Sequence, residues 1–379
     1  MITKLAIQNF RGLKSVTLDH LRRVTILVGG NDTGKTSVLE ALTLLLGDGA
    51  ALQSLPLAFR SNQQTGQPSK EHLPNEGTRD DFENFWLWLF YDRDLRNRIS
   101  LIASTSDGTQ VQLNSEERSS PSQATVLFRV VEAGKRETPL IIRQTNIETI
   151  PGLASPPNLR VSRLSIRPSD PVEDAERYNQ VALNAGGELR IEQVMREINP
   201  DVRRLRYAKL PGTSSPLVFV DIGLSRAIPA PQMGQAFNRL LHIYTEILSA
   251  RTNVLLVDEI ENGIFTSNLL PIWKGLLAVC EQENVQVFAT THSLECVRAA
   301  LAAAVERGKD ELGVQERLSQ ERLRSVRRGV RRRGTGQTDS GTDELGVQRM
   351  QVVNGQIEAV ALSQETLAYA LENNLEIRK

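Results

Sequence analysis

Apolar residues along the chain follow two repeating spacings, one typical of strands and one typical of helices. Strand-like apolar runs cover residues 5–10 and 25–28, and residues 35–46 carry apolar side chains at helical spacing. The same alternation returns late in the chain as helix 234–250, strand 253–257, helix 269–281, strand 286–289 and helix 294–306. Strands that alternate with helices predict an α/β fold with a mostly parallel core sheet.

The middle of the chain has a different pattern. Short β runs separated by turn residues predict an antiparallel β subdomain, and they cover residues 86–91, 99–104, 111–113, 126–131 and 140–143. A stretch rich in Pro and Ser at 151–171 predicts a connector. Helical spacing at 175–185 and 189–198 then predicts a helical subdomain.

These patterns divide the chain into five parts. We predict a core from 1–50 and 205–309, an antiparallel β subdomain at 80–150, a connector and helical lobe at 151–204, a basic low-complexity insertion at 310–342, and a C-terminal strand and helix at 343–379 that return to the core. The longest apolar runs fall far short of the roughly 20 residues of a membrane span. No membrane association is expected.

One glycine-rich segment has the form G-x-x-x-x-G-K-[ST] between an apolar strand and an amphipathic helix, the context of a phosphate-binding P-loop. Backbone N–H groups at such a helix N-terminus would bind phosphate. The predicted nucleotide-binding residues are Gly29, Gly30, Asn31, Asp32, Thr33, Gly34, Lys35, Thr36 and Ser37. Lys35 is expected to reach the β- and γ-phosphates, and Thr36 to ligate Mg²⁺. The alternative is a glycine turn that precedes a helix by chance.

Two acidic residues follow the apolar run Val-Leu-Leu-Val at 254–257. A buried parallel strand would deliver Asp258 and Glu259 to the carboxyl edge of the sheet. Asp258 is predicted to hold the metal with Thr36, and Glu259 to accept a proton from, or orient, the water that attacks the γ-phosphate. The alternative is a strand that ends in a solvated acidic pair.

A further strand at 287–289 ends in Thr290, Thr291 and His292. Placed beside the acidic strand end, His292 could hydrogen-bond the γ-phosphate or the attacking water. A lone histidine is more often structural, and the order of the three strand-end motifs favours the functional role here. We therefore predict Glu259 and His292 as the catalytic residues.

With these motifs in place, the chain resembles the ABC-type ATPase heads of the RecF, SMC and OLD group, especially bacterial AAA-domain proteins classed as OLD-like. The resemblance rests on residues 7–14 (Ile-Gln-Asn-Phe-Arg-Gly-Leu-Lys), the P-loop, residues 258–263 and residues 290–295. It implies a P-loop NTPase fold, with Glu259 as catalytic carboxylate and His292 as switch histidine. Residues 261–263 would belong to a loop that crosses a dimer interface.

The signature motif of this group departs from its usual form near Leu-Ser-Gly-Gly-Gln. The counterpart here is Gln-Met-Gly-Gln at 232–235, so only Gly234 and Gln235 keep a glycine-opened helix start that could contact the partner's nucleotide. A plain helix start is the alternative. OLD nucleases continue into a TOPRIM domain with an Asp-x-Asp motif, and that motif is missing after Ala289. We therefore expect any nuclease to be a separate protein.

The charges of the 379-residue chain balance, with 45 Lys+Arg and 45 Asp+Glu. Residues 317–333 nevertheless hold eight Arg and one Glu, which could contact nucleic-acid phosphates or simply be a solvated basic loop. The sequence thus predicts a cytoplasmic Mg²⁺-dependent ATPase that dimerises around ATP. Its partners could include DNA or a separate nuclease or effector, in DNA repair or anti-phage defence. The alternatives are an ATP-gated sensor or scaffold with negligible turnover and, less favoured, a transporter ATPase.

Overall fold

The computed structural model describes residues 1–47, 87–120, 123–132, 138–143, 147–149, 159–164, 170–209, 212, 215–249, 252–309, 344–373 and 377. The basic insertion predicted at 310–342 lies outside these residues. No helix in the described ranges is both long enough and apolar enough to cross a membrane.

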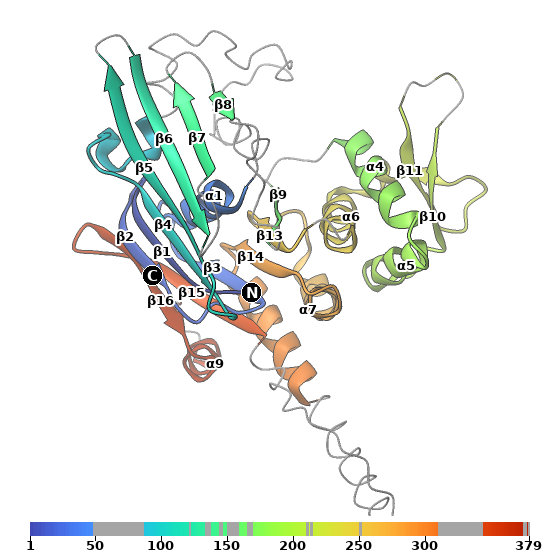
Figure 1. The fold of residues 1–379 in the computed structure, drawn as a ribbon. Coiled ribbons are helices and arrows are strands. Elements are labelled where there is room, and N and C mark those ends of the chain that lie inside the picture. Colours follow the sequence, from blue (N-terminus) through green and yellow to red (C-terminus); the bar gives the residue numbers. More distant parts are fainter. Residues whose placement is uncertain are drawn as a thin grey trace, which may run out of the picture.

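A six-stranded sheet forms the centre of the molecule, with strand order β16-β15-β3-β14-β13-β9 (Figure 1). Five of its strands run parallel to one another, and β16 pairs antiparallel with β15 at one edge. The strands are β3 (Val24–Val28), β9 (Val161–Leu164), β13 (Val254–Val257), β14 (Gln286–Thr290), β15 (Leu345–Val353) and β16 (Gln356–Leu362). The prediction of a mostly parallel core sheet is confirmed.

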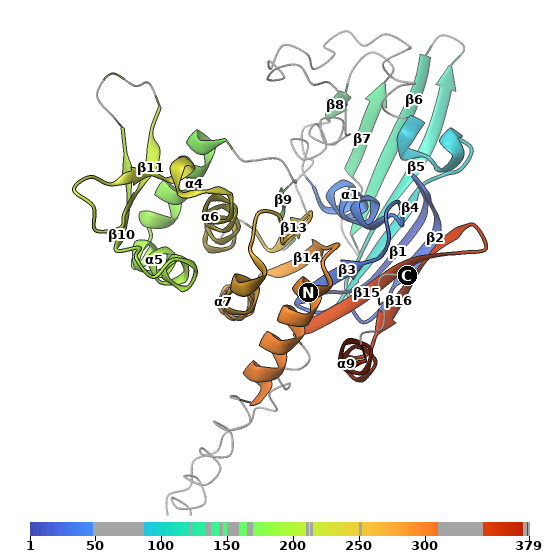
Figure 2. The ribbon, with the colours of Figure 1, turned by 180° about the vertical axis from the view of Figure 1, so that it is seen from behind.

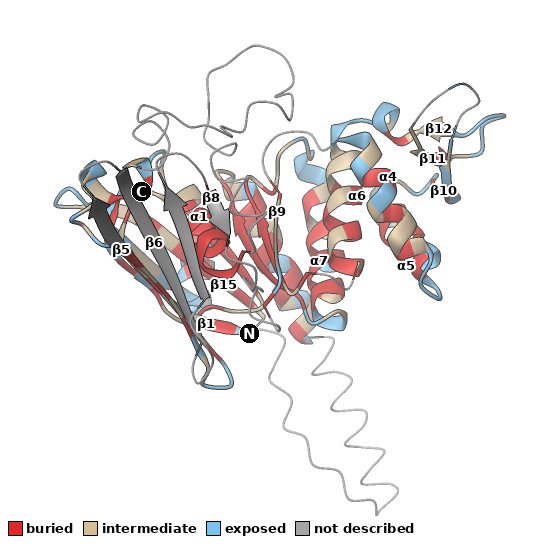
Figure 3. Cartoon of the chain, turned by 45° about the horizontal axis from the view of Figure 1, so that its top comes forward, coloured by how far each residue is buried: buried red, intermediate tan, exposed pale blue. Residues whose placement is uncertain are grey.

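Strands β3, β13 and β14 are buried on both faces, which explains their continuous apolar sequences. Leu27, Leu256 and Phe288 face a core that includes helix α1 (Lys35–Leu46). Their sequence neighbours face a second core, which contains α6 (Gln235–Leu248), α7 (Leu269–Gln282) and the helix over 294–309. Figure 3 shows that α1 is buried between this sheet and a second sheet.

The second sheet is antiparallel throughout, in the order β2-β1-β4-β5-β6-β7-β8, and lies on the far side of α1 (Figure 2). Its strands are β1 (Ile2–Phe10), β2 (Leu13–Leu18), β4 (Ser100–Thr105), β5 (Gln110–Ser120), β6 (Gln123–Glu132), β7 (Thr138–Arg143) and β8 (Ile147–Thr149). Apolar residues of β1, β2, β4 and β5 pack on α1. The P-loop helix is therefore enclosed by two sheets.

A smaller helical lobe lies on the opposite side of the central sheet, as Figures 1 and 2 both show. It contains α4 (Pro171–Ala182), α5 (Gly187–Ile198) and a three-stranded sheet of β10 (Arg204–Ala208), β11 (Leu217–Asp221) and β12 (Ile228–Pro229). Helix α4 begins at an Asp170 side chain that accepts a hydrogen bond from the Val172 amide, with Pro171 at the first helical position. Helix α6 packs against α4 and α5 and joins this lobe to the core.

Three sequence-based boundaries differ from the structure. Strands β1 and β2 belong to the antiparallel sheet and not to the core sheet, since they pair with each other and with β4. Strand β9 lies inside the predicted connector at 151–171 and pairs with β13 in the core. Strands β10 to β12, assigned by sequence to the core, form the sheet of the helical lobe. The pattern of apolar residues predicts that a strand is buried, but it does not predict which sheet the strand joins.

The prediction of a strand at 86–91 is also wrong for residues 87–91, which are the part of it that the structure describes. The chain there forms two 3₁₀ turns, Leu87–Leu89 and Tyr91–Arg93, with a single bridge between Phe90 and Phe10. Leu89 and Phe90 are adjacent and both buried, which a regular strand cannot achieve against one core. The Leu89 carbonyl accepts a hydrogen bond from the Arg11 amide, which fixes the turn against the end of β1.

A buried charge cluster connects α1 to both sheets. Glu40 of α1 is almost completely buried, and its carboxylate lies 2.7 Å from Nη1 of Arg11 and 3.6 Å from Nη2 of Arg163. Burial raises the pKa of the Glu40 carboxyl, and the two guanidinium groups oppose that rise. Arg11 follows β1 and Arg163 lies in β9, so one carboxylate joins three layers.

Replacement of Glu40 should destabilise the fold of the chain. Glu40→Ala leaves two buried guanidinium groups without their counter-charge, and we expect the free energy of unfolding to fall by about 3–5 kcal/mol. The matched control is Asp19→Ala, which breaks the exposed Lys4–Asp19 pair and should cost no more than about 1 kcal/mol. Urea unfolding of both variants measures the difference, and equal losses would contradict the role given to Glu40.

Candidate nucleotide-binding site

The predicted P-loop joins β3 to α1 at the carboxyl edge of the central sheet. Gly34 caps the N-terminus of α1 in a left-handed conformation, and Asp32 also has a positive φ. The Lys35 ammonium lies inside the loop and donates to the carbonyl oxygens of Gly29 (2.9 Å) and Gly30 (2.6 Å). Burial lowers the pKa of this ammonium, and the nearby acids Asp258, Asp32, Glu259 and Glu261 oppose the shift. The loop thus places a cation among amide groups at a helix N-terminus.

Two glycines of the loop, Gly29 and Gly34, are required by close packing from other parts of the chain. A Cβ atom on Gly29 would lie 2.4 Å from the carbonyl oxygen of Met350 in β15. A Cβ atom on Gly34 would lie 2.6 Å from the side chain of Leu13 in β2. The P-loop is therefore held between β15 and the start of β2.

Asp258 comes directly after β13 and meets two hydroxyl groups from neighbouring elements. Its buried carboxylate oxygen Oδ1 accepts from Thr290 Oγ1 at 2.6 Å and from Thr36 Oγ1 at 3.3 Å. Thr290 ends β14, and Thr36 opens α1. The structure therefore brings together the P-loop hydroxyl and the acidic strand end predicted as a metal pair.

Glu259 has a left-handed backbone, with φ of 47°, which is uncommon for a residue with a side chain. Its carboxylate oxygen Oε1 lies 3.9 Å from Nε2 of His292, and both side chains are partly exposed. Glu261 accepts hydrogen bonds from the amides of His292 and Ser293 at 2.8 and 3.1 Å. Glu261 therefore fixes the backbone that carries His292, a role that sequence reasoning missed.

Arg239 is a second residue near the site that sequence reasoning missed. It lies on α6, and its Nη2 donates to the backbone carbonyl oxygen of Asp258 at 2.5 Å. Burial lowers the pKa of its guanidinium, while Asp258, Glu259 and Glu261 oppose that change. Arginine at one position of an amphipathic helix gives no signal in the sequence, because the same pattern describes a solvated side chain.

The tentative signature residues Gly234 and Gln235 start α6. Gly234 has a φ of 95°, and the space where its Cβ would lie is open. Gln235 packs against Gly263, whose missing Cβ would lie 2.8 Å from Gln235 Cγ. The signature counterpart and the loop at 261–263 therefore lie next to each other, close to Phe265, which is 79% exposed.

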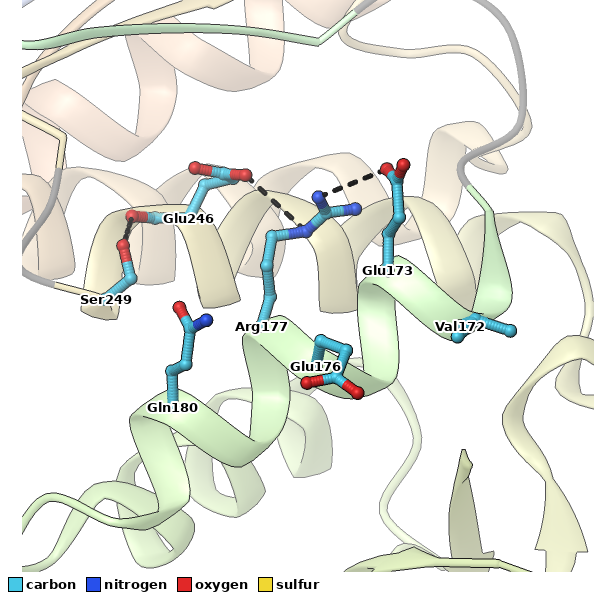
Figure 4. Close-up of a pocket in the computed structure, with 7 residues that line it drawn as sticks. All are labelled: Val172, Glu173, Glu176, Arg177, Gln180, Glu246 and Ser249. Carbon is cyan, nitrogen blue, oxygen red and sulfur yellow. Dashed lines mark hydrogen bonds and ion pairs between the residues drawn. The ribbon is translucent and has the colours of Figure 1, made fainter. Parts of the chain in front are cut away.

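Two cavities in the described part of the chain differ in their relation to the P-loop. The first, of about 590 Å³, is lined by Ser37 of α1 together with Arg11, Gly12, Trp88, Phe90, Asp92 and Arg93. The guanidinium of Arg93 lies 3.5 Å above the Trp88 ring. The second lies between α4 and α6, where Arg177 bridges Glu173 and Glu246, as Figure 4 shows. Only the first cavity borders the P-loop.

Thr36 and Asp258 supply oxygen ligands that suit Mg²⁺. This ion keeps several waters and is often bound through one or two protein oxygens plus substrate phosphates. The hydroxyl of Thr36 and the buried carboxylate of Asp258 lie 3.3 Å apart at the helix N-terminus, so both oxygens can face one position. The residues present therefore fit the ion that the P-loop motif implies.

The fold and this site define a P-loop NTPase of the α/β class. Residues 92–298 match the family described as "AAA domain, putative AbiEii toxin, Type IV TA system", and the chain belongs to that family. Residues 1–148 match a second model, described as "AAA ATPase domain". The prediction of a bacterial AAA-domain protein is confirmed, and the chain carries an AAA-type ATPase domain.

The similar proteins match either most of the chain at low identity or a short part of it at higher identity. An "ATP/GTP phosphatase" of Helicobacter pylori is 20% identical over 337 residues, which cover 78% of this chain and 86% of that protein. The DNA replication and repair protein RecF of Nitrosococcus oceani is 48% identical over 56 residues, 15% of each chain. The crystal structure of an SMC head bound to the C-winged helix domain of ScpA matches with a TM-score of 0.48 and 11% identity, covering 97% of this chain and 99% of that chain.

The packing of Gly29 gives a direct test of the P-loop geometry. Gly29→Ala forces a methyl group against the Met350 carbonyl, and we expect a loss of about 1–3 kcal/mol in the free energy of unfolding. Gly30→Ala is the control, since its Cβ would make only an ordinary contact, 3.8 Å from Thr33 Cγ2. Thermal unfolding should separate the two variants. If both melt at the wild-type temperature, the described contact with β15 is not present.

Proposed function

We propose that this chain binds ATP with Mg²⁺ at the P-loop and hydrolyses it with Glu259 as the general base. The observation that carries the proposal is the convergence of three strand ends at one edge of the sheet. The P-loop follows β3, Asp258 and Glu259 follow β13, and His292 follows β14. In a parallel sheet, this edge is where ligands bind.

In the proposed reaction, Lys35 neutralises charge on the β- and γ-phosphate oxygens. Thr36 and Asp258 hold the Mg²⁺, which lowers the charge on the phosphates when bound. Glu259 orients the attacking water and accepts its proton, since its carboxylate is exposed to solvent on the side of His292. His292 donates a hydrogen bond to the γ-phosphate or to the water.

The cavity beside Ser37 gives the nucleoside a place to bind. Ser37 directly follows the P-loop residue Thr36 and lines this cavity together with Arg11 and Trp88. The Trp88 ring, 45% exposed, offers a stacking surface for the base.

We also propose that two heads close around ATP as a homodimer, with Gly234 and Gln235 of one copy against the nucleotide of the other. The exposed start of α6 and the loop at 261–263 lie together, and the exposed Phe265 follows that loop by two residues. A surface of this kind supports the proposal, because exposed aromatic side chains are typical anchors of protein interfaces.

Substitution of Glu259 separates the ATPase from an ATP-gated switch. Glu259→Gln keeps the shape but removes the base, so turnover should fall at least about 100-fold while ATP binding persists. Lys35→Ala should lose ATP binding itself. The measurement is phosphate release with Mg²⁺ and with EDTA, which should abolish it. If the wild-type chain shows no turnover and Glu259→Gln changes nothing, the switch or scaffold function is correct instead.

We propose that the ATP cycle acts on a partner, which includes DNA or a separate nuclease or effector, in DNA repair or anti-phage defence. The Arg-rich segment at 317–333 supports the DNA partner through its charge, because phosphate contacts need only cations. Double-stranded DNA should stimulate turnover of the full chain but not of a variant that lacks 317–333, and the stimulation should weaken with salt. Equal stimulation of both proteins would contradict the role of this segment.

A further inference from the structure

The peptide unit between Asp258 and Glu259 is held at both of its polar atoms. Its carbonyl oxygen accepts from Arg239 Nη2 at 2.5 Å, and its N–H donates to Thr290 Oγ1 at 2.8 Å. These two contacts come from opposite sides, one from α6 and one from the end of β14. The plane of this peptide therefore cannot rotate without breaking a hydrogen bond.

This fixed peptide contributes to the unusual backbone of the proposed general base. Glu259 has a φ of 47°, a conformation that a residue with a side chain adopts only when its surroundings impose it. The φ angle is the rotation between the two peptide units that flank the residue, and the unit after Glu259 is held as well, because the Ile260 amide donates to the Thr290 carbonyl oxygen at 3.1 Å. Arg239 of α6 supplies the constraint on the carbonyl oxygen of the unit before it.

The charges around Arg239 suit this task. Its guanidinium is largely buried and faces the carboxylates of Asp258, Glu259 and Glu261. The Nη2 hydrogen bond is made to the backbone carbonyl oxygen of Asp258. Arg239 can therefore set the direction in which the Glu259 side chain leaves the backbone.

We propose that Arg239 is a positioning residue that holds Glu259 in its strained conformation and so aims the carboxylate at the attacking water. Since Arg239 lies five residues after Gly234, the same contact transmits movements of α6 and the helical lobe to the catalytic carboxylate. The proposal rests on the proposed ATPase function.

The experiment compares Arg239→Met and Arg239→Lys with wild type for kcat, KM and ATP binding. Arg239→Met removes the donor, and kcat should fall about 100-fold, the size expected when a reacting group is misplaced by about 1 Å. The Kd for ATP should stay within about threefold, because the hydrogen bond that the substitution removes is made to the backbone that follows β13 and not to the P-loop. Arg239→Lys keeps a charged donor and should recover at least about tenfold of the lost kcat.

Arg177→Met is the matched control. Arg177 is also a largely buried arginine of the helical lobe and pairs with Glu246 of α6, but it lies at the second cavity, away from the P-loop (Figure 4). Its loss should lower the melting temperature and leave kcat within about threefold of wild type.

The outcomes are distinct. A selective fall in kcat with rescue by lysine supports the proposal. An equal fall in kcat and in ATP affinity, no rescue, or a similar kcat loss in Arg177→Met would overturn it and leave only a structural role. An unchanged kcat in Arg239→Met, with wild-type turnover intact, also overturns it but leaves the ATPase function standing. Absence of turnover in the wild type would refute the ATPase function itself.

Discussion

The buried carboxylate of Asp258 is the contact on which the geometry of this site depends. One of its oxygens accepts hydrogen bonds from hydroxyls of α1 and β14, so a single group sets the spacing of three strand ends. A buried carboxylate needs such partners, because without them its desolvation would be costly. The Asp258 carboxylate and the Thr36 hydroxyl also suit a magnesium ion. The same oxygen atoms therefore stabilise the fold and can bind the metal.

Enclosure of α1 is the second constraint. The helix that carries Lys35 and Thr36 lies between two sheets, and the Glu40 carboxylate joins it to Arg11 and Arg163 on either side. Small shifts of the antiparallel sheet or of β9 must therefore be transmitted to the phosphate-binding loop. The helical lobe reaches the site by a different route, through α6 and the peptide before Glu259.

The sequence predicted the α/β class and the placement of the main motifs because those depend on local patterns. Strands β3, β13 and β14 are apolar throughout, and each ends in residues with recognisable chemistry. Strand β9 was missed because an edge strand with Ser162 and Arg163 has no continuous apolar run. Arg239 and Glu261 were not predicted as positioning groups, since their roles come from contacts with backbone atoms 19 and 31 residues away in sequence. Such contacts do not alter the spacing of apolar and polar residues, so the sequence pattern does not reveal them.

The position of β15 has a consequence for the order in which the protein can be made. The carbonyl of Met350 packs on Gly29, and residues 345–349 of β15 pair with all five residues of β3. The P-loop begins at residue 29, yet β15, which packs on it, is synthesised more than 300 residues later. During translation, the contact between Gly29 and the Met350 carbonyl cannot form until residue 350 has left the ribosome. Pairing over such a sequence separation is intrinsically slow, so the nascent head passes through a stage that has its P-loop sequence but not a finished phosphate site.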